Sequence, residues 1–308
     1  MSTVRPFSVS RVFAAPRALV YQAATDVVHM ARWMSPAGFK VIKADLDLRL
    51  GGSYHYGLQG PDGAEMWGKQ VYREIVPPEK LVYVQSFSDR DGGLTRHPLA
   101  ATWPLEMLAT ATFEDLGDGT TRLTISWVPY NSDEAGNATF DGARAGMETG
   151  FGGMFANLEA HLAATERQLI NSRVVNAPRE LVWKAFTDPR HVNAWWGPDG
   201  FENVDVEQDV RVGGVWKFTM VGPDGRKYPN KSTYVEILAP ERLVYDHGDW
   251  ESVHFRAVVT LEEVGAQTLV TLTLIGPSRE FRDSLLGFAI EGGRQHLAKL
   301  DAYLATMS

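Results

Sequence analysis

The sequence of 308 residues contains no cysteine, and this absence removes several kinds of chemistry. Disulfide crosslinks, thiolate nucleophiles and cysteine-ligated metal sites all require thiols. The sequence also has no run of the roughly 18 uncharged apolar residues that a membrane-spanning helix needs. Its N-terminal segment lacks the apolar centre of a signal peptide. We therefore expect a cytoplasmic protein without a membrane span.

Runs of basic residues are missing as well. The chain has 30 Lys and Arg against 38 Asp and Glu, a formal net charge of −8. Because the basic residues are scattered and form no stripe, nucleic acid is not an expected partner. The eight histidines follow no metal-ligand spacing, and no nucleophile elbow is present. The sequence predicts no metal, no cofactor and no recognisable catalytic motif.

The sequence does contain a long internal repeat. Residues 11–83 align without a gap on residues 173–245, and 32 of these 73 positions are identical. Such self-similarity is the signature of a duplicated structural unit. We predict two domains, residues 1–165 and 166–308, joined by a very short linker.

The pattern within one copy predicts an α+β domain. An alternating strand pattern is followed by proline at the first turn of a helix, as in Ala15-Pro16 and Ala177-Pro178. A second short helix follows, and then about six strands separated by turn sequences such as GPDG. Each copy ends in one long helical pattern. This order favours an antiparallel sheet with helices on one face.

Four repeated motifs resemble one known superfamily. They are A-P-R-x-L-V, W-x-x-P-x-G-F after a short helix, R-[LV]-G-G, and E-I-x-x-P-E-[KR]-L-V-Y. Together they resemble the SRPBCC or START-like superfamily, and more closely its branch of activator of heat-shock protein 90 ATPase homologue-like proteins. The resemblance implies two helix-grip domains, each a curved antiparallel sheet around a long C-terminal helix, with a cavity between sheet and helix. It further implies binding of an apolar small molecule, or cyclisation or ring chemistry on one.

The resemblance has one departure. The eukaryotic co-chaperones after which the branch is named carry a separate chaperone-binding domain with an Asn-rich Trp-His-Trp motif. No such motif occurs in this sequence, whose nearest string is His191-Val-Asn-Ala-Trp-Trp. A chaperone is therefore an alternative partner that only the family label suggests.

Aromatic residues expected to point inward are the first candidates for a ligand site. A cavity lined by aromatic rings with a few polar tips suits an apolar or aromatic molecule. The alternative is that these rings only fill the core. The candidates are Trp33, Tyr54, Tyr56 and Trp67 in the first copy, and Trp195, Trp196, Trp216 and Phe218 in the second.

The long helix of the first copy adds further candidates. It holds five glycines between residues 141 and 153, and each glycine costs about 1 kcal/mol relative to alanine in a helix. Such glycines favour close packing, a bend or room for a ligand. Arg144 and Glu148 stand four residues apart, either as polar anchors beside Phe151 in the cavity or as a solvated surface pair. The second copy has Leu286 and Ile290 at the two charged positions.

An insertion of about 14 residues lies within residues 86–107 of the first copy. Its His97 and Trp103 predict a lid over the cavity mouth, unless the segment is only a variable surface loop. His254 stands on a predicted strand of the second copy and is expected either to point inward or to be an ordinary core histidine.

Three functions remain open from the sequence. The first is binding of a small hydrophobic or aromatic ligand in a helix-grip cavity. The second is chaperone-associated regulation through a surface. The third is a cyclase- or hydrolase-like enzyme, for which Arg144, Glu148, His97 and His254 are the evident acid–base candidates.

Overall fold

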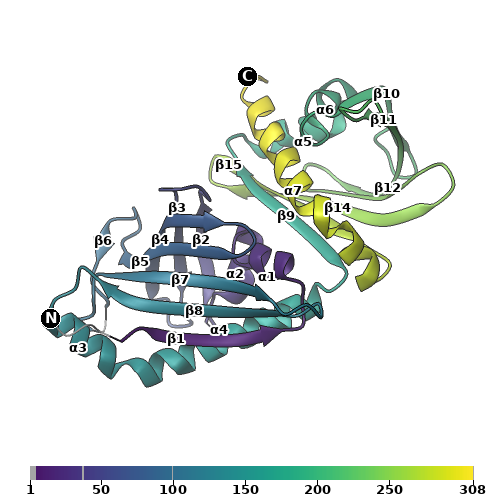
Figure 1. Ribbon diagram of the computed structural model, residues 1–308. Helices are drawn as coiled ribbons and strands as arrows, with labels where there is room; N and C mark the ends of the chain where they lie inside the picture. Colours follow the sequence, from purple (N-terminus) through teal and green to yellow (C-terminus); the bar gives the residue numbers. More distant parts are fainter. Residues whose placement is uncertain (1–4, 37, 99, 308) are drawn as a thin grey trace. The chain divides into compact units, whose positions relative to one another are not determined.

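The computed structural model describes residues 5–36, 38–98 and 100–307. The chain divides into two compact units between Ala164 and Thr165. Each unit contains one antiparallel sheet and its own long C-terminal helix (Figure 1).

The first unit runs from strand to helices to sheet to helix. Its elements are β1 (Phe7–Phe13), α1 (Arg17–Ala23), α2 (Val27–Trp33), β2 (Lys40–Leu46), β3 (Ser53–Gln59), β4 (Glu65–Val76), β5 (Lys80–Ser88), β6 (Leu94–Thr95), β7 (Glu106–Asp115), β8 (Thr121–Tyr130), α3 (Glu134–Gly142) and α4 (Arg144–Ala164).

The second unit repeats this order without β6 and α3. Its elements are β9 (Gln168–Val175), α5 (Arg179–Thr187), α6 (Pro189–Trp195), β10 (Glu202–Gln208), β11 (Val215–Val221), β12 (Lys227–Leu238), β13 (Arg242–Gly248), β14 (Val253–Val264), β15 (Gln267–Ile275) and α7 (Arg279–Leu304).

The two sheets have the same topology. The strand order is β1-β8-β7-β5-β4-β3-β2 in the first and β9-β15-β14-β13-β12-β11-β10 in the second. The short β6 pairs with β5 outside this path. In both sheets the first strand pairs with the last, so the chain returns to its starting edge before the long helix begins. The predicted α+β class with two helix-grip domains is confirmed.

One tryptophan is held in the same way in both units. The Trp33 indole Nε1–H donates to the carbonyl of Ala23 at 2.8 Å. In the second unit, Trp195 donates to Ala185 at 3.0 Å. Both tryptophans are buried. Each bond ties the second short helix to the end of the first and satisfies a buried polar atom. Trp33 and Trp195, predicted as ligand contacts, therefore hold the helices together.

The Arg-x-Gly-Gly motif has a steric cause. A Cβ on Gly52 would stand 2.3 Å from the carbonyl oxygen of Asp47, and a Cβ on Gly214 would stand 2.1 Å from that of Asp209. Real Cβ atoms do not approach oxygen so closely, so only glycine fits the turn that precedes β3 and β11. This motif is a structural feature of the hairpin.

The long helix of the first unit departs from the predicted single helix. It is broken at Ala143, which caps α3, and α4 begins at the next residue. A Cβ added at any of the five glycines between residues 142 and 153 would meet no atom within 4 Å. Close packing is therefore not the reason for these glycines. The helix α4 runs alongside β1 (Figure 1) and buries Phe151, Phe155 and Leu158.

A pair of histidines joins α2 to α4. His29 Nδ1 lies 2.7 Å from His161 Nε2. Burial lowers the pKa of His161 to about 4, with smaller contributions from the nearby His29 and Arg32. In the second unit the corresponding pair is His191 with Tyr303, whose ring nitrogen and hydroxyl lie 2.9 Å apart. The two histidines that the sequence repeats thus contact the long helix.

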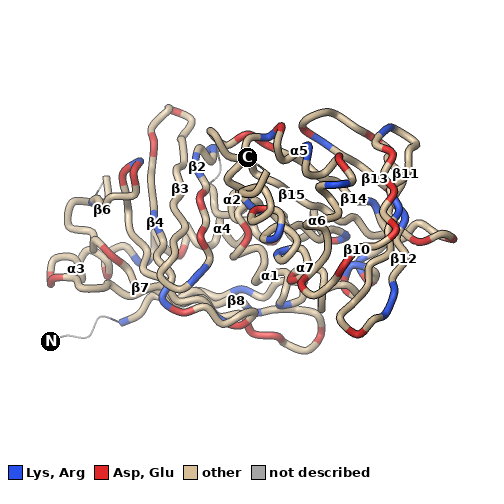
Figure 2. The backbone as a smooth tube through the Cα atoms, turned by 90° about the horizontal axis from the view of Figure 1, so that it is seen from above, with Lys and Arg blue, Asp and Glu red and all other residues tan. Residues whose placement is uncertain are grey.

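Positions of Lys and Arg and of Asp and Glu are interspersed along the backbone of both units (Figure 2). Exposed ion pairs such as Arg90–Glu65 at 2.6 Å contribute little to stability. None of the helices in the described part of the chain is sufficiently long and apolar to cross a membrane.

The glycine environments predict opposite effects of one substitution at two positions. Gly52→Ala should lower the free energy of unfolding by about 2 kcal/mol, because its methyl group overlaps a backbone oxygen. Gly146→Ala, where the methyl group meets open space in α4, should raise it by about 0.5–1 kcal/mol. Urea unfolding of the two variants and of the parent protein measures both free energies of unfolding. A lower value for Gly146→Ala than for the parent protein would contradict the open space assigned to its added methyl group.

The histidine pair predicts acid sensitivity in the first unit. The pKa of His161 is about 4 in the folded protein and 6.5 for an ordinary histidine, so the unfolded chain binds the proton more readily. Stability is therefore lost as pH falls from about 6.5 towards 4. His161→Tyr installs the residue of the second unit and should recover about 1 kcal/mol at pH 5 while changing little at pH 7.5. Hydrogen exchange of α4 at both pH values is the measurement. Equal recovery at both pH values would mean that packing, and not protonation, is responsible.

Candidate functional site

Each sheet turns one face towards its long helix, and this is called the inner face here. In the first unit the α4 residue Phe151 lies 4.9 Å from Trp127 between ring centroids and 5.8 Å from Phe7. In the second, Tyr234 and Tyr245 belong to the same buried cluster as the helix residue Leu297. Because side chains alternate along a strand, these contacts fix which residues of every strand face inward.

The first unit carries a lateral row of residues across the inner face. Tyr54 pairs with Gln70, Gln70 with Gln85, and Gln85 with Met107 on successive strands. This set of four residues is the first row. The Tyr54 ring stacks on Tyr56 at 5.1 Å, and the Gln85 amide donates to the Tyr56 hydroxyl at 3.2 Å. The first row therefore combines aromatic surface with amide groups.

The tyrosine hydroxyls around the first row are un-ionised donors. Burial raises the pKa of Tyr54, Tyr72 and Tyr83 well above its usual value of 10. Tyr72 is almost entirely buried, and its hydroxyl has no hydrogen-bond partner in the protein. An unpaired buried hydroxyl costs about 1–3 kcal/mol, so it calls for a physical explanation.

The second unit carries the equivalent second row, in which Trp216, Ser232, His247 and Phe255 pair on successive strands. Ser232 Oγ lies 2.9 Å from His247 Nδ1. Burial, together with the nearby His254, lowers the pKa of His247 to about 4, so its imidazole is neutral at pH 7. The indole nitrogen of Trp216 is buried without a hydrogen-bond partner in the protein. The second row thus presents a hydroxyl, an imidazole and an indole N–H.

The ring of Trp196 links the second row to the long helix. Its centroid lies 4.9 Å from Trp216 and 4.9 Å from His296 of α7. His296 Nδ1 lies 2.7 Å from the carbonyl of Gly292, so this nitrogen carries the proton and Nε2 is an acceptor. Burial lowers the pKa of His296 to about 4, and its Nε2 is buried without a partner in the protein.

The insertion covers one end of the first unit. His97 stands between Phe87 and Trp103, with ring centroids 4.6 and 5.8 Å away, and Trp103 lies 6.1 Å from Phe140 of α3. The Thr102 and Thr139 hydroxyls lie 2.7 Å apart and join the insertion to the same helix. The second unit links β13 and β14 with residues 249–252 alone.

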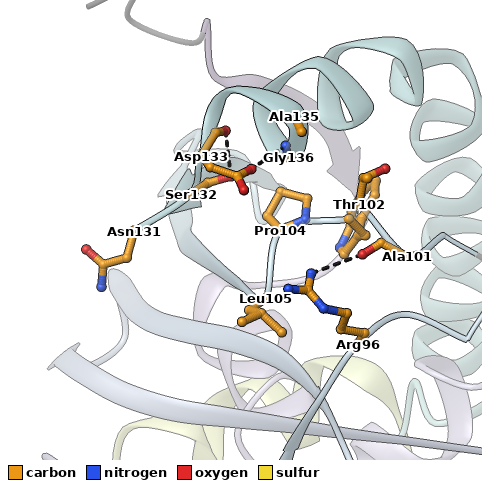
Figure 3. A pocket seen from close by; sticks show the side chains of 11 residues that line it. Arg96, Ala101, Thr102, Pro104, Leu105, Asn131, Ser132, Asp133, Ala135 and Gly136 are labelled. Carbon is orange, nitrogen blue, oxygen red and sulfur yellow. Dashed lines mark hydrogen bonds between the residues drawn. The ribbon is translucent and has the colours of Figure 1, made fainter.

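Two surface pockets lie outside the rows, and no row residue lines either of them. One, of about 210 Å³, lies between the insertion and the start of α3 (Figure 3). Inside it, Arg96 donates to the carbonyl of Ala101 at 3.0 Å and Asp133 accepts from Gly136 at 2.7 Å. Its lining consists of Arg96, Ala101, Thr102, Trp103, Pro104, Leu105, Asn131, Ser132, Asp133, Ala135 and Gly136. Of the predicted site residues, Trp103 alone lines it.

The other pocket, of about 330 Å³, lies at the turn from β10 to β11. It reaches Gln208, whose amide donates to the Tyr234 hydroxyl at 2.7 Å and so touches the inner face. The pocket is lined by Glu207, Gln208, Asp209, Arg211, Gly213, Gly214, Val215 and Lys217.

Four of the predicted aromatic residues lie on the inner faces as expected: Tyr54, Tyr56, Trp216 and Phe218. The expected inward direction of Trp67 is wrong. Trp67 pairs with Gly57, whose side of β3 is opposite to that of Tyr56, and a Cβ on Gly57 would stand 2.6 Å from the Trp67 ring. Trp67 therefore covers Gly57 on the outer face, where its indole donates to Glu65 at 2.9 Å.

The inward direction considered for His254 is also wrong. His254 is the extra residue of an irregularity in β14. Phe255, which faces inward, pairs with His247 of β13, and the next pair is Val253 with Gly248, so the register passes over His254. Its side chain is exposed and pairs with Asp249 at 3.2 Å. Because neighbouring residues of a strand point to opposite faces, a position next to the inward-facing Phe255 is consistent with this outward direction.

The expected pair of Arg144 and Glu148 does not form. Arg144 binds Asp141 at 2.7 Å and the carbonyls of Arg5 and Pro6, the latter at 3.2 Å. Glu148 is exposed on the helix surface. Arg144 thus anchors the N-terminal segment, and Phe151 is a core residue on the inner face.

Sequence reasoning missed the polar members of the rows, Gln70, Gln85, Ser232 and His247. Ser232 and His247 are 15 residues apart and belong to different strands. The repeat could have identified these two residues. Ser232 and His247 each stand two positions from a tyrosine that faces inward, Tyr234 or Tyr245, and therefore share its face of the sheet.

A comparison with protein-family models identifies the family. The model of the family described as activator of Hsp90 ATPase homolog 1-like protein matches residues 14–163 and again residues 176–305. No curated protein matches the sequence.

Solved structures similar to the chain cover one copy or both. A protein of Nitrosomonas europaea is 23% identical, with a TM-score of 0.43, over 46% of this chain and 97% of its own. A protein of Mycobacterium smegmatis is 26% identical, with a TM-score of 0.43, over 53% of this chain and 93% of its own. The di-domain ARO/CYC protein BexL of the BE-7585A biosynthetic pathway is 14% identical, with a TM-score of 0.41, over 97% of this chain and 98% of its own.

The ring contacts of the insertion predict local opening. Trp103→Ala removes the ring between His97 and Phe140, so amide exchange in residues 94–105 should rise at least tenfold while exchange in the β7–β8 hairpin stays unchanged. Trp250→Ala is the control, because Trp250 is 56% exposed in the short link of the second unit. Mass-spectrometric hydrogen exchange measures both. Unchanged exchange in the Trp103 variant would show that other contacts hold the insertion.

Proposed function

The chain belongs to the activator of Hsp90 ATPase homolog 1-like family, and we propose that it binds a small, flat, largely apolar molecule on the inner face of its sheets. The observation that carries this proposal is a set of buried polar atoms without partners in otherwise aromatic surroundings. These atoms are the Tyr72 hydroxyl in the first unit, and the Trp216 Nε1 and His296 Nε2 in the second.

Unpaired buried polar atoms support ligand binding for an energetic reason. Each costs about 1–3 kcal/mol in the folded protein, and native structures keep few of them. A bound molecule that supplies a donor or an acceptor removes this cost and gains affinity from it. The aromatic rings beside these atoms supply the apolar surface that fixes such a molecule.

The two units differ in what lies beside their rows. The insertion of the first unit contacts α3 through the rings of Trp103 and Phe140, whereas the second unit has only a short link there. The glycines Gly146, Gly150 and Gly287 of the long helices are exposed, so an added Cβ at these positions would face solvent and they mark no space above the rows.

A second candidate is catalysis on the bound molecule. One observation favours it: Ser232 and the neutral His247 lie within hydrogen-bonding distance on the inner face. A neutral imidazole beside a hydroxyl is the arrangement that acid–base chemistry uses. Regulation of a chaperone rests on the family description alone.

The proposal is tested first by native mass spectrometry of gently purified protein. We expect a stoichiometric apolar molecule of a few hundred daltons, which extraction then identifies. Recovery of a chemically altered molecule after incubation with the extracted compound would favour catalysis. A ligand-free mass, together with no binding of added aromatic probes, would contradict the proposal and make chaperone capture the next experiment.

Tyr72→Phe gives a sharper test. Removing the unpaired hydroxyl should stabilise the ligand-free protein by about 1 kcal/mol and weaken binding of the extracted molecule about 3–10-fold. Tyr234→Phe is the matched control in the second unit, because this hydroxyl accepts a bond from Gln208 and its loss should destabilise. Urea unfolding and calorimetric titration measure the two effects. Destabilisation by Tyr72→Phe would show that the hydroxyl has a structural partner.

A further inference from the structure

The two rows differ most at their centre. The first row has Gln70 and Gln85 where the second row has Ser232 and His247. The Gln85 amide nitrogen already donates to the Tyr56 hydroxyl and to the Ser86 carbonyl, at 3.2 and 3.0 Å. Both N–H groups of this side chain are therefore engaged within the protein, and none is left for a ligand.

The donor and acceptor roles of the second row follow from its one short contact. Ser232 is fully buried, so its hydroxyl must donate a hydrogen bond, and the contact at 2.9 Å is with His247 Nδ1. Burial keeps the imidazole neutral at pH 7 by lowering its pKa to about 4. A neutral imidazole that accepts at Nδ1 carries its proton on Nε2. His247 thus offers an Nε2–H donor.

A second donor lies in the same row. Trp216 pairs with Ser232 on the neighbouring strand, and its buried Nε1–H has no hydrogen-bond partner in the protein. An indole nitrogen can only donate. One strand, β12, lies between those of Trp216 and His247, so two inter-strand spacings place their backbones roughly 10 Å apart. The row therefore presents two donors along the width of a small aromatic molecule.

The surroundings of these donors are aromatic. The Trp216 ring lies 4.7 Å from Phe218, and the His247 ring lies 4.7 Å from Phe255 with their planes inclined by 33°. His247 and Phe255 are half-buried, whereas Trp216 and Phe218 are buried. The row thus becomes more accessible towards the end where the second unit has no insertion.

From these observations we infer that the second copy binds an aromatic ketone or quinone, with one carbonyl oxygen accepting a hydrogen bond from His247 Nε2–H and, in a quinone, the second carbonyl oxygen accepting from Trp216 Nε1–H. This inference rests on the proposed ligand-binding function and adds the ligand's functional group and the copy that recognises it. Ser232 is a positioning residue, because it fixes the imidazole proton on Nε2.

The test compares two probes of nearly the same shape, 9-fluorenone and fluorene, of which only the first has a carbonyl oxygen. Tryptophan quenching gives both dissociation constants for the full chain. We expect fluorenone to bind about 3–10-fold more tightly than fluorene. His247→Leu should abolish this preference and leave fluorene binding unchanged, which also shows that the variant is folded. Gln85→Leu, the matched change in the first copy, should keep the preference.

A second variant and a second measurement keep the inference testable if His247→Leu is unstable. Nitrogen-15 NMR of the imidazole should show the Nε2–H form in the parent protein. In Ser232→Ala this form should lose its dominance, and the preference for fluorenone should fall about 2–3-fold. A preference that survives His247→Leu, or an Nδ1–H form in the parent protein, overturns the inference alone. Failure of both probes to bind overturns the proposed function with it.

Discussion

The packing of each long helix on the inner face of its sheet is the constraint on which the rest of the structure depends. The helix must cover an apolar surface that the sheet alone leaves to water. In the first unit Phe155 and Leu158 do this at the C-terminal half of α4, and Leu297 and Leu300 do it in α7. Phe151 in the N-terminal half of α4 adds to this cover by packing on Phe7 and Trp127, whereas the glycines around it are mostly on the solvent side of the helix.

The two copies agree in some contacts and differ in others. Bonds that hold the helices and strand ends are duplicated: Thr121 donates to the Ala15 carbonyl at 2.7 Å, and Thr268 donates to the Ala177 carbonyl at 2.8 Å. The inner-face tyrosines Tyr72 and Tyr83 also recur, as Tyr234 and Tyr245, but the neighbouring glutamines Gln70 and Gln85 are replaced by Ser232 and His247 in the second copy. The two copies thus keep the packed tyrosines and differ in the polar residues beside them.

The repeat, which supplied two examples of each pattern, was sufficient to predict two α+β domains, whereas the helix-grip arrangement was predicted from the family resemblance and the break of the first copy's long helix at Ala143 was not predicted. The sequence identified the strands, the short helices and the inward parity of Tyr54 and Tyr56, all from local alternation and turn residues. It failed where pairing across strands decides the outcome. The register of β3 against β4 puts Trp67 over Gly57, and the pairing of Phe255 with His247 leaves the adjacent His254 facing outward. Strand register is a tertiary property that a single strand does not encode.

The candidate site was harder to predict for the same reason. Ser232 and His247 become neighbours only when β12 pairs with β13, and a register shift after Tyr234 sets that pairing. Their contact has a cost, because a neutral buried imidazole gives up hydration and loses stability as pH falls. Glutamine at the same place in the other copy avoids this pH dependence. His161 imposes a similar pH dependence on the first copy through a contact between helices, so such a cost does not by itself indicate a ligand. The proposed ligand contact would give the second copy a reason to retain His247, and under that proposal the second copy is the one that discriminates between ligands.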